Sequence, residues 1–400
     1  MAERNGDTCM MESVFIFSEE LLSYRFGEQH PFDQKRLLLT KTLLEEVGAL
    51  TNEEILPPRR ATEAEIALIH DPQYIQAVQH ASSGLLGDPE PYGLGTEDTP
   101  VFPNMHEASS WVVGGAITGM EAILSGQTKR ALHLGGGLHH GFRGKASGFC
   151  VYNDTAVAIE LAKRQGYRVL YVDTDAHHGD GVQWAFYDDP AVCTLSIHET
   201  GRYLFPGTGS LQERGHGNGY GFSFNIPLDA FTEDESWLHA YEEAFREVAH
   251  YFQPDIIVTQ NGADAHFLDP LTHLCSTMKI YQRIPLLAKE IADVYCDGRW
   301  LAVGGGGYDH WRVVPRAWSY IWLAMKERDS PTDEIPKSWR EMWQKEAPVT
   351  LPINWDDGVH AYEPIPRKAE IDEKNEQTVK KALYICRSTS PFKKSQESSS

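Results

Sequence analysis

Apolar and polar positions along this chain form two kinds of segment. Short, continuously apolar runs alternate with longer stretches that have helical periodicity. The predicted strands are 14–17, 130–134, 169–172, 192–197, 255–259 and 300–303, and the predicted helices are 34–46, 106–124, 156–164, 233–251 and 278–295. Continuous rather than alternating hydrophobicity in the strands is typical of a parallel sheet covered on both faces by helices. We therefore predict an α/β fold, with three α/β/α layers around a mostly parallel central sheet.

The alternation of strands and helices fades after residue 326. This change predicts one α/β domain in residues 1–326 and a Pro-rich, charged C-terminal extension in residues 327–400. Within the extension, residues 378–386 are predicted to form one short docking helix. The Ser-rich end from Lys393 to Ser400 is predicted to be disordered.

Composition narrows the class of protein. A net charge of -21, with no Lys/Arg-rich run, argues against nucleic-acid binding. The same negative charge is compatible with a cationic substrate. Six cysteines without a CxxC pair favour reduced thiols over a disulfide framework. No long apolar span or signal-peptide pattern is present, so we expect a cytoplasmic protein that does not bind membranes. The oligomeric state is not predicted.

The chemistry begins where the run at 169–172 ends. Asp173, Asp175 and His177 follow at every second position, so on an extended backbone they project to one side. Carboxylate and imidazole ligands without a thiolate suit an open catalytic site for zinc, iron(II) or manganese. Taken alone, the run also fits a solvated turn whose side chains cap backbone groups.

Three other segments share this format of an apolar strand followed by a loop with reactive side chains. GGGLHH follows the strand at 130–134, QNGAD follows the strand at 255–259, and GGGGY follows the strand at 300–303. The carboxyl ends of neighbouring parallel strands form one rim, so all four loops can meet there. The glycine runs lack the spacing of a phosphate-binding loop, which makes that alternative weak.

Together the segments GGGLHH (135–140), DTDAHHGDG (173–181), GADAH (262–266) and GGGGY (304–308) resemble the zinc-dependent histone deacetylase superfamily. The resemblance covers roughly residues 12–325 and is strongest to the bacterial acetoin-utilisation branch, the AcuC-like proteins. It implies the arginase/deacetylase-like version of the predicted fold, with the catalytic domain in residues 1–326.

The resemblance implies which residues hold metal ions. Asp175, His177 and Asp264 match the ligands of the catalytic ion, which is Zn²⁺ or alternatively Fe²⁺. Three protein ligands plus an open position are what a hydrolytic metal needs. For Asp264 alone, the competing interpretation is a loop carboxylate that caps a helix. A K⁺ site beside this ion is implied at Asp173, Asp175, His177, Ser196 and Ile197.

The resemblance also implies the catalytic side chains. His139 and His140 match the family's active-site pair, in which the second member acts as general base and then acid. Each histidine is expected to hydrogen-bond a carboxylate, His139 with Asp173 and His140 with Asp180. Tyr308 matches the tyrosine that donates to the substrate carbonyl, although a tyrosine after four glycines could also anchor packing.

Four positions match the walls of the family's acyl-lysine tunnel. Phe149 and Phe205 resemble its two aromatic walls, with Gly148 beside them and Leu271 as a further apolar wall residue. Aromatic rings accept a methylene chain and exclude a branched one. Either phenylalanine could instead belong to the ordinary core.

Two more matches concern the rim and the interior. Asp98 matches the rim aspartate that accepts hydrogen bonds from the substrate backbone, which favours a peptide over a free small molecule. Arg36 matches an arginine beside the cavity for released acetate, and its alternative is a surface helix arginine.

The implied reaction is hydrolysis of the acetyl-lysine amide in a protein of acetoin or acetate metabolism, such as an acetyl-CoA synthetase, to lysine and acetate. One alternative is an amidohydrolase of acetylpolyamines, which the negative charge would attract as readily. A second is a binuclear manganese hydrolase of the arginase fold. A third is a non-catalytic acyl-lysine-binding protein.

Overall fold

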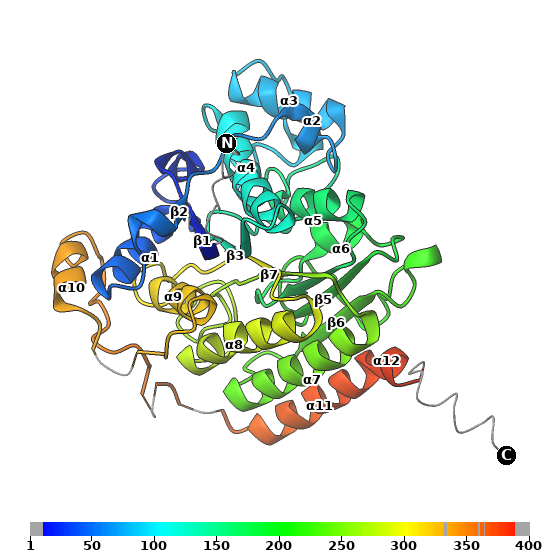
Figure 1. Ribbon diagram of the computed structural model, residues 1–400, viewed down its shortest axis with the longest axis vertical. Coiled ribbons are helices and arrows are strands. Elements are labelled where there is room, and N and C mark those ends of the chain that lie inside the picture. Colours follow the sequence, from blue (N-terminus) through cyan, green and yellow to red (C-terminus); the bar gives the residue numbers. More distant parts are fainter. Residues whose placement is uncertain (1–10, 332–333, 359–360, 364, 389–400) are drawn as a thin grey trace, which may run out of the picture.

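A single parallel sheet forms the centre of the protein (Figure 1). The computed structural model describes residues 11–331, 334–358, 361–363 and 365–388. Every neighbouring pair in the strand order β2-β1-β3-β8-β7-β4-β5-β6 is parallel, which confirms the predicted fold class. The strands are β1 (Met11–Ile16), β2 (Ile55–Leu56), β3 (Thr128–His133), β4 (Val169–Asp173), β5 (Val192–Glu199), β6 (Ser223–Leu228), β7 (Ile256–Gln260) and β8 (Trp300–Val303).

Helices cover both faces of this sheet. In Figure 1, α4 and α5 lie on one side, and α7, α8 and α9 lie on the other. The longer helices are α1 (Lys35–Glu46), α3 (Pro72–Ser82), α4 (Met105–Leu124), α5 (Asp154–Arg164), α7 (Asp234–Phe252), α8 (Met278–Tyr295), α9 (Val314–Met325) and α11 (Lys368–Ala382). The short ones are α2 (Glu63–Ile66), α6 (Asp180–Ala185), α10 (Lys337–Trp343) and α12 (Tyr384–Ser388). Strands buried on both faces explain why their sequences are continuously apolar.

The sequence prediction omits β2, β6, α2, α3, α6, α9 and α10 and misplaces the C-terminal helices, and three of these differences have a physical reason. Strand β6 contains Pro227, which argues against a central strand but is tolerated at the sheet edge where β6 lies. Helix α9 is buried at all twelve positions, so its sequence shows no polar face. The single helix predicted at 378–386 is wrong, because α11 begins at Lys368 and α12 follows after Leu383.

The sheet order places the four loops named above at one edge. Strands β3, β8, β7 and β4 are consecutive neighbours, and their carboxyl ends lead into the segments that carry the histidine pair, the glycine run and the aspartates. In an open parallel sheet this edge is where ligands bind. The topology therefore brings together side chains that are far apart in sequence.

The remaining expectations have mixed outcomes. Helix α11 packs against β6 and α7, while the domain boundary at residue 326 stays a prediction. The five cysteines in the described ranges are free. Among the helices that the structure describes, none is long and apolar enough to cross a membrane.

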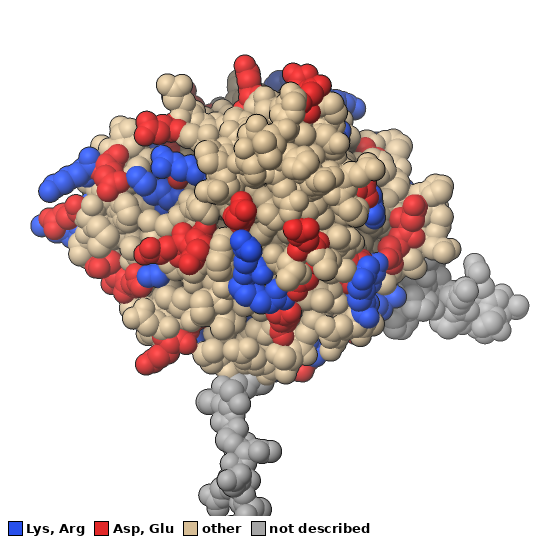
Figure 2. All heavy atoms as spheres, turned by 90° about the horizontal axis from the view of Figure 1, so that it is seen from above, with Lys and Arg blue, Asp and Glu red and all other residues tan. Residues whose placement is uncertain are grey.

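Acidic and basic side chains are interspersed on the face of the protein shown in Figure 2. The predicted disorder from Lys393 onward lies outside the described residues.

Candidate active site

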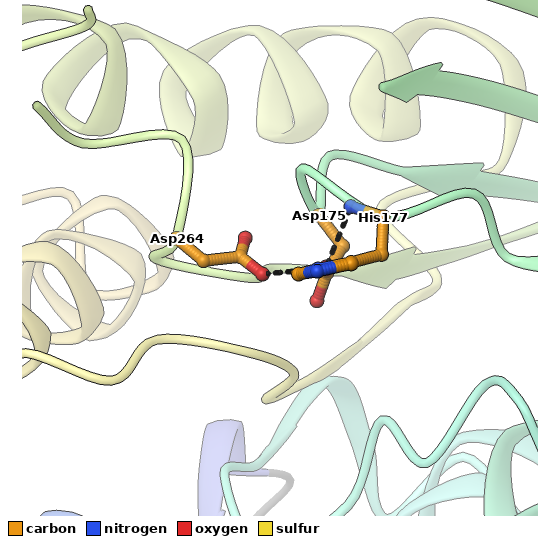
Figure 3. Close-up of side chains that lie close together, drawn as sticks. All are labelled: Asp175, His177 and Asp264. Carbon is orange, nitrogen blue, oxygen red and sulfur yellow. Dashed lines mark hydrogen bonds and ion pairs between the residues drawn. The ribbon is translucent and has the colours of Figure 1, made fainter. Parts of the chain in front are cut away.

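Two loops bring three potential metal ligands together at the carboxyl edge of the sheet (Figure 3). Asp175 and His177 follow β4, and Asp264 follows β7. One ligand atom from each lies within 4.8 Å of the others, and all three side chains are buried. His177 Nδ1 lies 3.1 Å from Asp175 Oδ1 and 2.9 Å from Asp264 Oδ2. Among the described residues, this is the one cluster of at least three His, Cys, Asp or Glu side chains with such spacing.

The surroundings of this cluster fit a cation. Burial together with the neighbouring Asp175 raises the pKa of Asp264 to about 7, because two carboxylates repel each other strongly in a buried site. The Gln260 amide and the Gly306 N–H each donate to Asp175 Oδ2 at 2.7 Å. A Cβ on Gly306 would lie 2.3 Å from Asp264 Oδ2, so only glycine lets the backbone approach here. A divalent ion would offset the paired negative charges, and its ligand types are those of open hydrolytic sites.

The two adjacent histidines have different electrostatic environments. His139 Nδ1 lies 2.8 Å from Asp173 Oδ2, and His140 Nδ1 lies 2.6 Å from Asp180 Oδ1, as the resemblance implied. Burial alone would lower the pKa of His139, but Asp173 and Asp175 raise it to about 9. Burial and the charge on His139 lower the pKa of His140. His140 is therefore the neutral member of the pair.

Tyr308 and His140 both lie near His177. Its ring centroid is 6.5 Å from that of His177 and 5.7 Å from that of Phe149. The backbone N–H of Tyr308 donates to Asp269 Oδ2 at 2.8 Å, which fixes the loop after β8 to the loop after β7. Burial raises the pKa of the Tyr308 phenol well above its usual range, so the group remains a hydrogen-bond donor.

The two predicted aromatic wall residues, Phe149 and Phe205, pack against catalytic side chains. The Phe205 ring centroid lies 5.0 Å from that of His140, and a Cβ on Gly148 would meet both rings, at 2.5 Å from His140 Cδ2 and 2.8 Å from Phe205 Cε1. Phe149 has φ +69°, and its carbonyl accepts from the Tyr24 hydroxyl at 2.6 Å. Only glycine at position 148 therefore lets the backbone pack this closely against the rings of His140 and Phe205.

The other substrate candidates lie at different depths. Asp98 is exposed, and its carbonyl is 3.2 Å from Nε2 of His30, whose ring packs on Phe149. Leu271 is half-buried in the loop after β7, where its N–H donates to Asp269. Arg36 is buried, so the alternative of a surface arginine is wrong. Its guanidinium donates to the carbonyls of Gly305 and Gly307 at 3.0 and 2.9 Å.

The predicted K⁺ ligands lie on neighbouring strands. Asp173 on β4 pairs in register with Ser196 on β5, and Ile197 is the next residue. The Ser196 hydroxyl is 2.8 Å from His198 Nδ1, and Ile197 is buried. The register places these residues beside Asp175 and His177, and the K⁺ site itself stays a prediction.

Sequence reasoning missed several residues that hold the site in place. The Tyr171 hydroxyl donates to Asp173 at 2.6 Å, and Asp154 accepts from the N–H groups of Gly137 and Leu138. Gln260 binds Asp175, and Asp269 binds the Tyr308 backbone. A polar residue that ends an otherwise apolar strand, such as Gln260, was the available signal.

Fold and site together define a hydrolase in which three protein ligands leave a metal position open, with a paired histidine and a tyrosine facing it. The Histone deacetylase domain model matches residues 30–325. The chain belongs to the histone deacetylase family and is a hydrolytic deacetylase. A catalytic metal ion is part of this family's chemistry, and the Asp-His-Asp cluster can hold it.

Curated relatives and solved structures agree with this assignment. The chain is 61% identical over 382 residues to the acetoin utilization protein AcuC of Bacillus subtilis, covering 95% of this chain and 98% of that one. It is 48% identical over 372 residues to AcuC of Staphylococcus xylosus, covering 92% and 97%. Two crystal structures of an HDAC homolog, one complexed with SAHA and one from Aquifex aeolicus, are 29% identical, with TM-scores of 0.80 and 0.79. Each alignment covers 92% of this chain and 100% of the other.

Proposed function

We propose that this protein is a metal-dependent lysine deacetylase that hydrolyses acetyl-lysine in proteins to lysine and acetate. The observation that carries the proposal is the neutral, Asp180-bonded His140 beside the Asp-His-Asp cluster. The Phe205 ring beside His140 and the Phe149 ring beside Tyr308 supply aromatic surface suited to a methylene chain, which separates a lysine amide from its backbone.

The side chains have distinct roles in this reaction. Because Nδ1 of His140 donates to Asp180, its Nε2 is free to accept a proton from the attacking water and to return it to the leaving amine. His139 remains protonated beside Asp173 and stabilises negative charge in the site. The Tyr308 phenol donates a hydrogen bond to the carbonyl oxygen as it becomes an oxyanion, a contribution of about 10²–10³-fold in rate.

Asp175, His177 and Asp264 would hold the metal ion. When bound, the ion supplies a Lewis acid that polarises the amide carbonyl and lowers the pKa of water. We propose Zn²⁺, with Fe²⁺ as the alternative, because both accept one imidazole and two carboxylates. We also propose K⁺ at the carbonyls beside Ser196.

The acetoin utilization proteins among the relatives support a role in acetoin or acetate metabolism. We propose a protein of that metabolism, such as an acetyl-CoA synthetase, as the substrate. Exposed Asp98 near the entrance supports a polypeptide substrate, since a rim carboxylate can accept backbone N–H groups that an acetylated polyamine lacks.

Steady-state kinetics on purified, metal-loaded protein test the proposal. We expect kcat/KM for an acetyl-lysine peptide to exceed that for N-acetylputrescine by at least about tenfold, and His140→Ala to lose nearly all turnover while retaining metal. Elemental analysis should give one divalent ion per chain. Preference for acetylputrescine would support the polyamine alternative, and two ions would support the binuclear one.

A further inference from the structure

A surface cavity lies beside the loops that follow β5 and β7. Its volume is about 410 Å³, and its walls include Tyr203, His273 and Ile371. Tyr203 precedes Phe205 by two residues, and His273 follows Leu271 by two residues, so the cavity is continuous in sequence with the two loops that carry the tunnel candidates. Its third wall is α11, which lies outside the residues that match the family domain. We call this cavity the side pocket.

An exposed aromatic side chain is held at the side pocket in a strained backbone conformation. Phe231 has φ +65°, which bulky residues rarely adopt, and its side chain is 44% exposed. Its N–H donates to the His273 carbonyl at 2.9 Å, and its ring centroid lies 6.3 Å from that of His273. Strain of this kind persists only where the surroundings enforce it, and it concentrates at binding sites.

Contacts from helix α11 hold the backbone on both sides of Phe231 in this conformation. Asn375, buried in the middle of α11, accepts from the Asp229 N–H at 2.9 Å and donates to the Thr232 hydroxyl at 2.8 Å. These two contacts bracket Phe231 in the sequence. The C-terminal extension therefore fixes the turn that presents the Phe231 ring at the side pocket.

The charges around the side pocket pair with one another. Lys374 is 3.1 Å from both Asp229 and Glu370, and Arg367 is 2.7 Å from Glu370. His273 Nδ1 is 2.8 Å from Oε1 of the fully buried Glu199, which fixes its ring. With its ions paired and Tyr203 and Phe231 exposing aromatic surface, the pocket suits an uncharged, apolar occupant.

We infer that the side pocket receives a large apolar or aromatic side chain of the substrate protein, a few residues along the chain from the acetyl-lysine. This inference rests on the proposed function. An extended peptide advances about 3.3 Å per residue, so a bound substrate crosses from the Phe205 loop onto the neighbouring aromatic surface. A free acetylated amine has no such residue, so the pocket selects for polypeptides.

Three substrates test the inference on the full-length, metal-loaded protein. They are an acetyl-lysine peptide scanned with phenylalanine at each flanking position, the same peptide with alanine, and acetyl-lysine blocked at both backbone ends. We expect phenylalanine at one position to raise kcat/KM about tenfold over alanine, chiefly through a lower KM. Phe231→Ala should remove this preference and leave kcat/KM for blocked acetyl-lysine within about twofold.

Two further variants make the result decisive. Phe231→Gly removes the same ring without the left-handed backbone penalty, so it keeps the test valid if the alanine variant does not fold. Tyr220→Ala removes another exposed aromatic ring outside the pocket and should keep the preference. Equal kcat/KM for the phenylalanine and alanine peptides, preference for a charged residue instead, or a preference that survives Phe231→Gly would overturn the inference. Absence of turnover with all three acetyl-lysine substrates would instead show that the proposed function is wrong, and the inference would fall with it.

Discussion

At the scale of single residues, the adjacent histidines His139 and His140 have different roles. His139 and His140 each bond one carboxylate, yet the pKa of His139 is raised to about 9 and that of His140 is lowered. The difference arises because Asp175 also faces His139, whereas His140 has the charge of His139 as its neighbour. When their environments push two pKa values apart, the neutral group can act as general base and the protonated group can stabilise negative charge.

This division predicts the pH dependence of activity. His140 must be neutral to accept a proton, and its lowered pKa places the acidic limb of kcat/KM below pH 6.5. Asp180 is one of the groups that raise this pKa, so Asp180→Asn should move the limb to still lower pH while reducing kcat/KM. Asp188→Asn, which changes an exposed carboxylate paired with exposed His216, is the control and should leave the limb in place. A limb that moves upward in Asp180→Asn would contradict this assignment.

Gly148 gives a prediction about shape. In Gly148→Ala, the new Cβ would collide with His140 and Phe205, so we expect kcat/KM to fall at least about tenfold, with stability reduced by about 1 kcal/mol from backbone strain at φ +50°. Gly48→Ala has comparable strain at φ +63° but no atom within 4 Å of the new Cβ. That control lacks the collision, so it should lose less stability than Gly148→Ala in urea unfolding and keep full activity. Equal activity in the two variants would show that the catalytic position of His140 does not depend on glycine at 148.

At the scale of elements, the sequence predicted what local periodicity and strand-end chemistry encode. All six predicted strands and five predicted helices exist within a few residues, because their apolar runs reflect burial. Helix α11 was placed wrongly because its buried stripe of Ile371, Asn375, Val379 and Ala382 contains an amide. That amide is buried for its tertiary hydrogen bonds to the 229–232 turn, which no local pattern reveals.

The candidate site shows the same limit. Asp175, His177 and Asp264 were predicted because each follows an apolar strand, and the sheet order then brings them together. Asp269 was missed because its contact with the Tyr308 backbone joins two loops that are adjacent only in the folded sheet. Contacts between loops depend on strand order, and one sequence does not specify that order.

At the scale of the whole molecule, the C-terminal extension is tied to the loop after β7. Asp357 accepts hydrogen bonds from His266 Nε2 at 2.9 Å, the Met278 N–H at 2.7 Å and Arg316 Nη2 at 2.8 Å. His266 lies two residues after Asp264. The extension therefore holds the loop that carries Asp264, one of the three potential metal ligands.

Removing this support should destabilise the protein. Asp357→Ala leaves the buried Arg316 guanidinium without its anionic partner, so we expect the free energy of unfolding to fall by about 3–5 kcal/mol in urea. Asp356→Ala, at the exposed neighbouring aspartate, should have almost no effect.

The contribution of Asp357 to stability should also depend on pH. Burial alone would raise the pKa of Asp357, but His266 and Arg316 hold it well below its usual range. The stabilisation is thus fully present above about pH 4 and is lost as the pH falls through the lowered folded-state pKa. A difference between wild type and Asp357→Ala that stays constant down to pH 2 would contradict this account.

A bound metal ion would act on the whole molecule, because its surroundings come from four neighbouring strands. Asp175 follows β4, Asp264 follows β7, the Gly306 N–H comes from the loop after β8, and His139 follows β3. Without a cation, two buried carboxylates face each other, so a divalent ion should favour the folded state by about 4 kcal/mol at a thousandfold excess over its Kd. We therefore expect a chelator to lower Tm by several degrees and to abolish activity, with both restored by Zn²⁺. Asp264→Asn should lose the metal-dependent rise in Tm, while Asp188→Asn, which changes an exposed carboxylate paired with His216, should retain it. A Tm that ignores metal in wild-type protein would mean that the three side chains do not share an ion.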